Sequence, residues 1–282
     1  MDWDGIGTSV QSLPLATVDD REPLAYHEAL VMVKIRGGSF QMGSPSEPGR
    51  CWDEGPQHQV TLESFYLSQT PVTQVQWRLV AGWEPVERAL HPDPSHFKGA
   101  HRPVEQVSWH GAREFCLRLS RRSGKHYVLP SEAQWEYACR AGTTAPFHCG
   151  ATLTSQQANF DAPDTDARGQ IAHSRAMTTD VSRFAANAFG LYDMHGNVWE
   201  WCADLWHSSY INAPVYGQSW LDADLPQDSG QLRVMRGGSW DSIQRHCRSA
   251  YRNNAPASLA EASIGFRVCR LPGTPQTQWP LD

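Results

Sequence analysis

The sequence has little charge of either sign and no excess of basic residues. Charged residues make up 19% of the 282 residues, and the formal net charge is −6. A surface that binds nucleic acid needs clustered lysine and arginine side chains, whereas the arginines here are scattered, so we expect no nucleic acid as a partner. No stretch approaches the run of about 18 apolar residues that spans a membrane, and the first residues lack the basic and apolar regions of a secretory signal. We therefore expect a cytoplasmic protein without membrane insertion.

The chain also lacks cysteine pairs. An odd number of cysteines without a close C-x-x-C pair argues against both a disulfide framework and a structural zinc site. We expect most of the seven to be buried thiols: Cys51, Cys116, Cys139, Cys149, Cys202, Cys247 and Cys269.

Glycine, proline and tryptophan are abundant instead. The chain has 22 Gly, 19 Pro and 12 Trp, which is typical of short, aromatic-rich segments joined by turns. We expect an α+β fold with few helices, short strands and much irregular loop. Residues 1–29 are predicted to be an N-terminal extension, 30–271 the domain and 272–282 a C-terminal tail.

Local signals place three helices and one repeated turn. Capping residues predict helices that begin after Thr73, Ser108 and Ser131, because a serine or threonine side chain there accepts a hydrogen bond from the first helical turn. The letters RGGSF at 36–40 and RGGSW at 236–240 each follow an apolar run. They suggest that equivalent strands open and close one domain.

Seven motifs together resemble one family, the formylglycine-generating, sulfatase-modifying enzymes, whose domain is a variant of the C-type lectin fold. They occur in the family's order across residues 31–270: GGSFQMGS (37–44), DEGPQHQVTLESFYLSQTPVT (53–73), RPVEQVSW (102–109), LPSEAQWEYACRAG (129–142), GLYDMHGNVWEWCAD (190–204), RVMRGGSW (233–240) and IGFRV (264–268). The resemblance implies the C-type lectin fold of this subclass. It does not by itself imply an enzyme, because one fold hosts enzymes and pure binders.

The enzymes of this family are expected to carry two cysteines just after the GGS-aromatic turn, which bind copper and handle the substrate thiol. Two thiolates on a short loop suit Cu(I). Here Ser242 stands where the first cysteine is expected, and Cys247 aligns with a packing position. We therefore expect no catalytic residues and no copper, and we interpret Cys247 as a small buried hydrophobe.

Other chemistries find no support either. The histidines at 91, 96, 101 and 126 lie in loop-like sequence without the helical pairing of a metal-binding set. His246 and Cys247 are adjacent, and adjacent side chains normally project in different directions, so they do not form a nucleophile and its base.

A structural calcium ion is implied by the matching run of the family. The resemblance assigns it to the side chain of Asp193, the carbonyls of Gly196 and Val198, and the carboxylate of Glu200. Calcium prefers such hard oxygen ligands on a flexible loop. The alternative is that Asp193 and Glu200 cap a turn or pair with arginines.

The stretch from 236 to 268 alternates framework-like residues with positions whose residue types look unrelated. In this it resembles the variable region of the variable proteins of diversity-generating retroelements, several of which use this same domain. The resemblance implies an exposed ligand surface, and tyrosine, histidine and asparagine are types that binding surfaces use. The predicted contacts are Asp241, Ser242, Ile243, His246, Tyr251, Asn253 and Asn254. Arg236, Arg248 and Arg252 are predicted to be internal props that bind loop carbonyls or carboxylates.

The sequence thus predicts a non-enzymatic ligand-binding protein with a diversified surface, whose partner is an unknown protein or other macromolecule. The alternatives are a thiol oxidase like the formylglycine-generating enzymes, and a structural or regulatory module. For each single contact, a residue that merely fills a surface loop remains the alternative.

Overall fold

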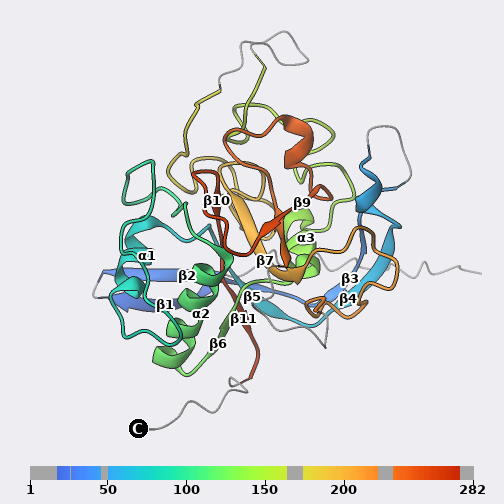
Figure 1. Ribbon diagram of the computed structural model, residues 1–282. Helices are drawn as coiled ribbons and strands as arrows, with labels where there is room; N and C mark the ends of the chain where they lie inside the picture. Colours follow the sequence, from blue (N-terminus) through green and yellow to red (C-terminus); the bar gives the residue numbers. More distant parts are fainter. Residues whose placement is uncertain (1–17, 26, 46–49, 164–173, 222–230, 274–282) are drawn as a thin grey trace, which may run out of the picture.

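The computed structural model describes residues 18–25, 27–45, 50–163, 174–221 and 231–273. Within them, three α-helices and eleven short strands form an α+β domain with long irregular connections (Figure 1). The expected fold class is confirmed. No helix in the described part of the chain has the length and apolar character needed to cross a membrane.

A five-stranded antiparallel sheet joins the two ends of the domain. Its strand order is β1 (Val18–Ala25), β2 (Glu28–Ile35), β5 (Phe65–Ser68), β11 (Cys269–Leu271) and β6 (His126–Val128). β5 pairs with β2 on one side and with β11 on the other. The first and last parts of the described chain are therefore held in one sheet.

A four-stranded sheet positions the candidate surface. Its order is β10 (Ile264–Gly265), β7 (Trp199–Leu205), β8 (Leu232–Arg236) and β9 (Arg252–Pro256). β8 pairs antiparallel with β9, so the segment between them leaves and re-enters the sheet at one end. A separate ribbon consists of β3 (Gly38–Met42) and β4 (His58–Leu62). The 3₁₀ turns are η1 (Trp52–Glu54) and η2 (Gln244–Cys247).

The three helices begin where the capping signals predict. They are α1 (Gln74–Ala81), α2 (Trp109–Ser123) and α3 (Glu132–Arg140). The side chains of Thr73, Ser108 and Ser131 each accept a hydrogen bond from a backbone N–H of the first turn. α1 contacts β1 and β2, and α2 contacts β6, whereas α3 lies against β7 and β8.

Two sequence interpretations need correction. Residues 18–25, assigned to an extension that ends at 29, form β1 and pair with β2, so the domain begins earlier than expected. The two RGGS turns are not equivalent either: β2 lies in the five-stranded sheet and β8 in the four-stranded sheet. After the first turn the chain continues as β3, whereas after the second it enters an irregular loop.

Buried side chains form two large clusters and one small one. The first large cluster joins α1, α2 and the strand ends around Trp77, Phe115 and Phe266, whose rings lie 5.3–6.0 Å apart. The second surrounds Trp135 of α3. The small cluster gathers Phe147, Phe160 and their neighbours around Cys247. The core therefore reaches up to the segment between β8 and β9.

Candidate functional site

The turn after β8 brings the backbone close to Cys247. Gly237 and Gly238 have φ angles of 99° and 76°, a region that favours glycine. A Cβ atom on Gly238 would lie 2.5 Å from the sulfur of Cys247. The two glycines thus allow the turn and the loop that follows it to pack together.

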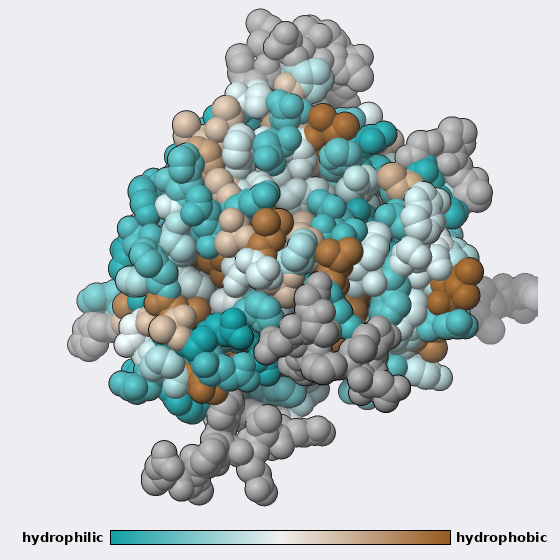
Figure 2. All heavy atoms as spheres, viewed as in Figure 1, coloured by the Kyte–Doolittle hydropathy of each residue, from teal (hydrophilic) through white to brown (hydrophobic). Residues whose placement is uncertain are grey.

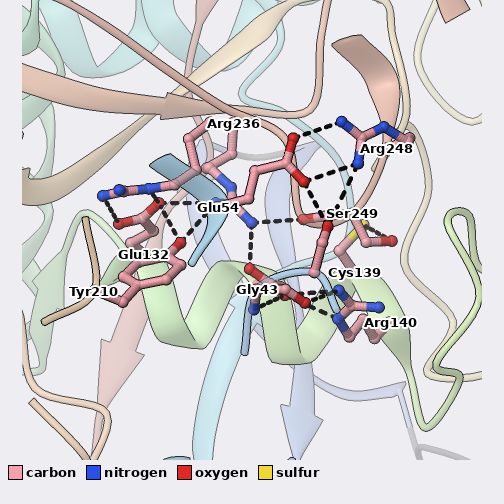
Figure 3. Close-up of polar contacts among 12 residues, drawn as sticks. Gly43, Glu54, Glu132, Cys139, Arg140, Tyr210, Arg236, Arg248 and Ser249 are labelled. Carbon is pink, nitrogen blue, oxygen red and sulfur yellow. Dashed lines mark hydrogen bonds and ion pairs between the residues drawn. The ribbon is translucent and has the colours of Figure 1, made fainter. Parts of the chain in front are cut away.

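Beneath this turn, Arg236 is completely buried between two carboxylates of α3 (Figure 3). Its Nη1 donates to Glu132 Oε1 at 2.7 Å, and its Nη2 donates to Glu136 Oε2 and to the carbonyl of Ser249, each at 2.5 Å. Charge-assisted hydrogen bonds of this kind are among the strongest in proteins. Arg236 therefore connects the segment that leads into β9, at Ser249, to helix α3.

Arg252, at the start of β9, uses the same carboxylate. Its Nε and Nη2 donate to the two oxygens of Glu132 at 2.6 and 2.8 Å, and its Nη1 donates to the carbonyls of Asp53 and His207 at 2.9 Å. Burial would raise the pKa of Glu132, but the charges of Arg252 and Arg236 outweigh it and lower that pKa. Glu132 therefore stays ionised.

Arg248 is the third arginine of this segment that pairs with a buried carboxylate. Its Nη1 and Nη2 donate to Glu54 Oε2 and Oε1 at 2.8 and 2.5 Å, and Ser44 Oγ donates to Oε2 at 2.5 Å. Burial would raise the pKa of Glu54, but the hydrogen bonds from Arg248 and Ser44 lower it. The pair connects η1, which contains Glu54, to the residue directly after η2. All three arginines act as the internal props that the sequence predicts. We call these arginines with Glu54, Glu132 and Glu136 the frame.

Residues 241–251, apart from Arg248 of the frame, form what we call the outer loop. Ile243 is 45% exposed, Asp241 is exposed, and His246 and Tyr251 are half-buried. The rings of His246 and Tyr251 lie 4.6 Å apart, and Tyr251 lies 6.1 Å from Trp199 of β7. Four of the predicted contacts thus reach the surface of one loop.

Asn253 and Asn254 lie in β9, at the edge of the sheet, and are half-buried. The side-chain carbonyl of Asn253 accepts a hydrogen bond from the backbone N–H of Asn254 at 2.9 Å. This bond occupies one of the groups that an edge strand would present to a ligand. Their role as ligand contacts stays a prediction.

Ser242 does not have the exposure predicted for a contact. It is buried, its Oγ accepts from the backbone N–H of Ser239 at 3.1 Å, and its carbonyl accepts from the N–H of Asp161 at 2.9 Å. A residue whose polar groups are used inside the loop is poorly placed to meet a ligand. Ser242 instead fixes the start of the outer loop.

Cys247 is fully buried, as expected for a packing residue. It packs with Phe147, Leu153 and Phe160, and burial raises the pKa of its thiol well above the ordinary value. The thiolate, which is the reactive form, is therefore disfavoured. Its carbonyl accepts from His195 Nδ1 at 2.7 Å, and burial lowers the pKa of His195 to about 3, so this histidine is neutral. All seven cysteines are free thiols.

The residues proposed to hold calcium are already in contact with protein groups. Glu200 Oε1 accepts from Arg267 Nη2 at 2.7 Å, and its Oε2 accepts from Arg267 Nε at 2.6 Å and from Trp135 Nε1 at 2.7 Å. Asp193 Oδ2 accepts from the backbone N–H of Ser182 at 2.7 Å.

These contacts test how well the four residues suit the ion. Because Arg267 balances the charge of Glu200, the set fits calcium only in part, through Asp193 and the carbonyls of Gly196 and Val198. The contacts favour the alternative of a capped turn and an arginine pair. Calcium stays a prediction.

One group near the outer loop has the composition of a metal site and was missed from the sequence. Ligand atoms of Cys51, Asp53 and Glu54 lie within 4.8 Å of one another. Glu54, however, is held on both oxygens by Arg248, and burial raises the pKa of the Cys51 thiol. We therefore interpret Cys51, Asp53 and Glu54 as residues that border the outer loop and not as ligands of a metal ion.

Comparisons with known proteins agree on the family. The family model described as "Sulfatase-modifying factor enzyme 1-like domain" matches residues 19–271. Among curated proteins, the serine/threonine-protein kinase pkn1 of Chlamydia caviae is 33% identical over an alignment of 262 positions that covers 85% of this chain and 38% of the kinase. This chain therefore spans less than half the length of that relative. The formylglycine-generating enzyme of Thermomonospora curvata is 30% identical, over 86% of this chain and 93% of the enzyme.

Two solved structures have the same fold. PvdO from Pseudomonas aeruginosa has a TM-score of 0.74 and 33% identity, and covers 89% of this chain and 97% of its own. Treponema denticola variable protein 1, a diversity-generating retroelement protein, has a TM-score of 0.69 and 25% identity, over 91% of this chain and all of its own. These likenesses confirm the C-type lectin fold of the formylglycine-generating-enzyme type.

Proposed function

The chain belongs to the family of sulfatase-modifying factor enzyme 1-like domains, and it is similar both to an enzyme and to a variable protein; we propose that it is a non-enzymatic ligand-binding protein. Its ligand surface is the outer loop, displayed as a diversified surface on the C-type lectin scaffold. The ligand is a protein or another macromolecule.

One observation carries the proposal: buried and exposed side chains alternate within a single short segment. Arg236, Arg248 and Arg252 point inward to carboxylates, whereas Ile243 and Tyr251 reach the surface. Exposed side chains such as Ile243 can change without disturbing the fold, whereas Tyr251 is half-buried and its ring lies 5.7 Å from the guanidinium of Arg248. Such a segment suits a surface whose contacts are selected case by case.

The surroundings of the surface also favour recognition over catalysis. Cys247 is buried and its thiol is protonated at neutral pH, so it is poorly suited to bind copper or attack a substrate. On the face shown in Figure 2, apolar residues lie as separate spots among polar ones. A mixed surface of this kind is typical of interfaces that form and dissociate.

A library experiment tests the proposal directly. Positions 241, 243, 246 and 251 would be randomised in one library, and positions 236, 248 and 252 in a second, and both would be displayed on yeast. We expect most clones of the first library to resist protease and to yield binders to a model protein target such as lysozyme. Few clones of the second should be folded. Equal loss of folded clones in both libraries would overturn the proposal.

The gene neighbourhood provides an independent test of diversification. A variable protein should have a reverse transcriptase gene nearby, together with a near-repeat of codons 236–268 that differs at adenines. If both were absent from the complete genome, the surface would not be diversified by a retroelement, and the proposal would reduce to a ligand-binding protein.

A thiol oxidase is the second candidate, and the 30% identity to the Thermomonospora curvata enzyme favours it. Incubation with Cu(I) and a sulfatase-type cysteine peptide would test it, with formation of the aldehyde measured by mass spectrometry. Oxidation that is lost in Cys247→Ala would establish the enzyme. A regulatory module of a larger protein is the other alternative, favoured by the chlamydial kinase, of which this chain matches 38%.

A further inference from the structure

A groove lies next to the outer loop, formed by residues outside the stretch 236–268. It has a volume of about 640 Å³, and its lining includes Ser44, Arg50, Trp52, Pro56 and Ile211. Trp52 is 68% exposed and Ile211 is 64% exposed. Two large apolar side chains this exposed, both of which line one groove, mark a place where a partner can bury them.

The groove and the outer loop are joined by an ion pair. Ser44, which lines the groove, donates to Glu54, and Glu54 binds Arg248 directly after η2. The backbone N–H of Cys51 donates to Oε1 of the same Glu54 at 3.3 Å, so Cys51 lies beside the ion pair. A ligand that covers Tyr251 and His246 can therefore continue across Cys51 into the groove.

Two arginines on this combined surface carry charges that no described residue neutralises. Arg245 is exposed, and its Nε donates to His246 Nε2 at 3.3 Å; Arg50 is half-buried, and its Nη1 donates to the carbonyl of Ser44 at 3.4 Å. Among the described residues, neither guanidinium has a carboxylate within ion-pair distance, in contrast to Arg248 on Glu54.

Neither of the two acidic groups nearby forms an ion pair with Arg50 or Arg245 among the described residues. Asp53 lies on the chain between Arg50 and Glu54, and Arg252 is the cation that most opposes the effect of burial on its pKa. Asp241 accepts a hydrogen bond from Ser239 Oγ at 2.5 Å. The guanidinium groups of the half-buried Arg50 and the exposed Arg245 are thus left for a ligand.

We propose that the partner presents an acidic polypeptide segment with a large apolar side chain, which enters the groove between Trp52 and Ile211 while its carboxylates meet Arg50 and Arg245. The inference rests on the proposed function, and it extends the ligand surface to residues that lie outside 236–268. Tryptophan and arginine are the residue types that most often dominate binding energy. Opposite charges would orient the partner and increase the association rate.

Synthetic peptides labelled with fluorescein provide the probe. Three short peptides share one tryptophan and differ only in the other residues, which are glutamate, glutamine or lysine. Fluorescence anisotropy would measure binding to the full chain at low and at physiological salt. We expect the glutamate peptide to bind at least about tenfold more tightly than the glutamine peptide, a difference of about 1.4 kcal/mol, and the lysine peptide not to bind.

Variants locate the binding. The double variant Arg50→Gln, Arg245→Gln should lose about tenfold in affinity for the glutamate peptide and become insensitive to salt, and Trp52→Ala should lose a similar factor. Matched controls are Arg21→Gln, an exposed arginine of β1, and Tyr216→Ala, an exposed aromatic residue that lines a different pocket. Neither control should change the affinity.

The outcomes separate this inference from the proposed function. Equal binding of the glutamate and glutamine peptides, or no effect of the arginine and Trp52 variants, would overturn the acidic ligand. The proposed function would survive that result if library binders to lysozyme still depended on positions 243 and 251. If no library binder depended on the outer loop, the proposed function would fail, whatever the peptides did.

Discussion

Arg245 and Arg248 stand three positions apart, yet they belong to different parts of the molecule. Arg248 donates hydrogen bonds to both carboxylate oxygens of the buried Glu54. Arg245 is exposed, and among the described residues its guanidinium bonds to its neighbour His246. The same contrast separates the frame from the outer loop as a whole. Ion pairs thus hold the loop from its buried side, and its exposed side chains take no part in them.

The largest expected effect comes from breaking the frame at its centre. Arg236→Met would leave Glu132 and Glu136 without a cation that both now share. Loss of one partner of a buried ion pair costs about 3–5 kcal/mol, and we expect that fall in the free energy of unfolding, measured with urea. Arg245→Met is the matched control and should stay within about 0.5 kcal/mol of the native protein. Equal effects of the two variants would contradict the distinction between frame and outer loop.

A smaller effect, with a clear pH dependence, is expected for the pair that joins η1 to η2. In the folded state the pKa of Glu54 lies below its ordinary value of 4.5. The ionised carboxylate therefore contributes stability above pH 4.5, and this contribution is lost as the pH falls through the folded pKa. Glu54→Gln should cost about 1–3 kcal/mol at pH 7.

The same variant should differ less and less from the native protein below pH 4.5. Unfolding in urea at a series of pH values would measure this. A constant difference between the two proteins down to pH 3 would show that Glu54 contributes by packing and not by its charge.

Features with a local signal could be predicted from the sequence. Thr73, Ser108 and Ser131 start helices because the capping bond joins residues two or three positions apart. The inward role of Arg236, Arg248 and Arg252 could also be predicted. Their partners could not: Glu54 lies 194 residues from Arg248, and Glu132 lies 120 residues from Arg252. Contacts between residues so far apart in the sequence leave no signal in the local sequence pattern around either residue.

Two errors have physical reasons that can be read in the structure. Strand β1 was missed because its sequence is polar; Glu22 is nevertheless buried, and it accepts from Tyr127 Oη at 2.7 Å and from Lys125 Nζ at 2.8 Å. Ser242 is predicted as a contact because it falls in the stretch that resembles the variable region, whereas its Oγ accepts from the N–H of Ser239 three residues earlier. The three-residue spacing of Ser239 and Ser242 was the sequence signal that could have predicted this bond.

Mutation and chemical labelling can test whether Cys247 is a buried packing residue or a reactive thiol. Cys247→Ala should cost about 1–2 kcal/mol, because it leaves a small cavity beside Phe147 and Phe160. In the native protein, iodoacetamide should label the exposed Cys149 and spare Cys247 until urea unfolds the chain, as peptide mass spectrometry would show. Labelling of native Cys247 as fast as Cys149 would contradict the packing role.

The smallest effect is expected from removal of calcium. Because Arg267 already balances Glu200, EDTA should lower the melting temperature by less than about 3 °C, which corresponds to about 1 kcal/mol or less. Asp193→Ala should abolish that response, whereas Glu200→Gln should lower the melting temperature with or without EDTA, since it leaves Arg267 buried without its counter-charge. No response of the native protein to EDTA would remove calcium from this loop. A drop of more than about 10 °C that disappears in Glu200→Gln would instead make Glu200 a ligand of the ion.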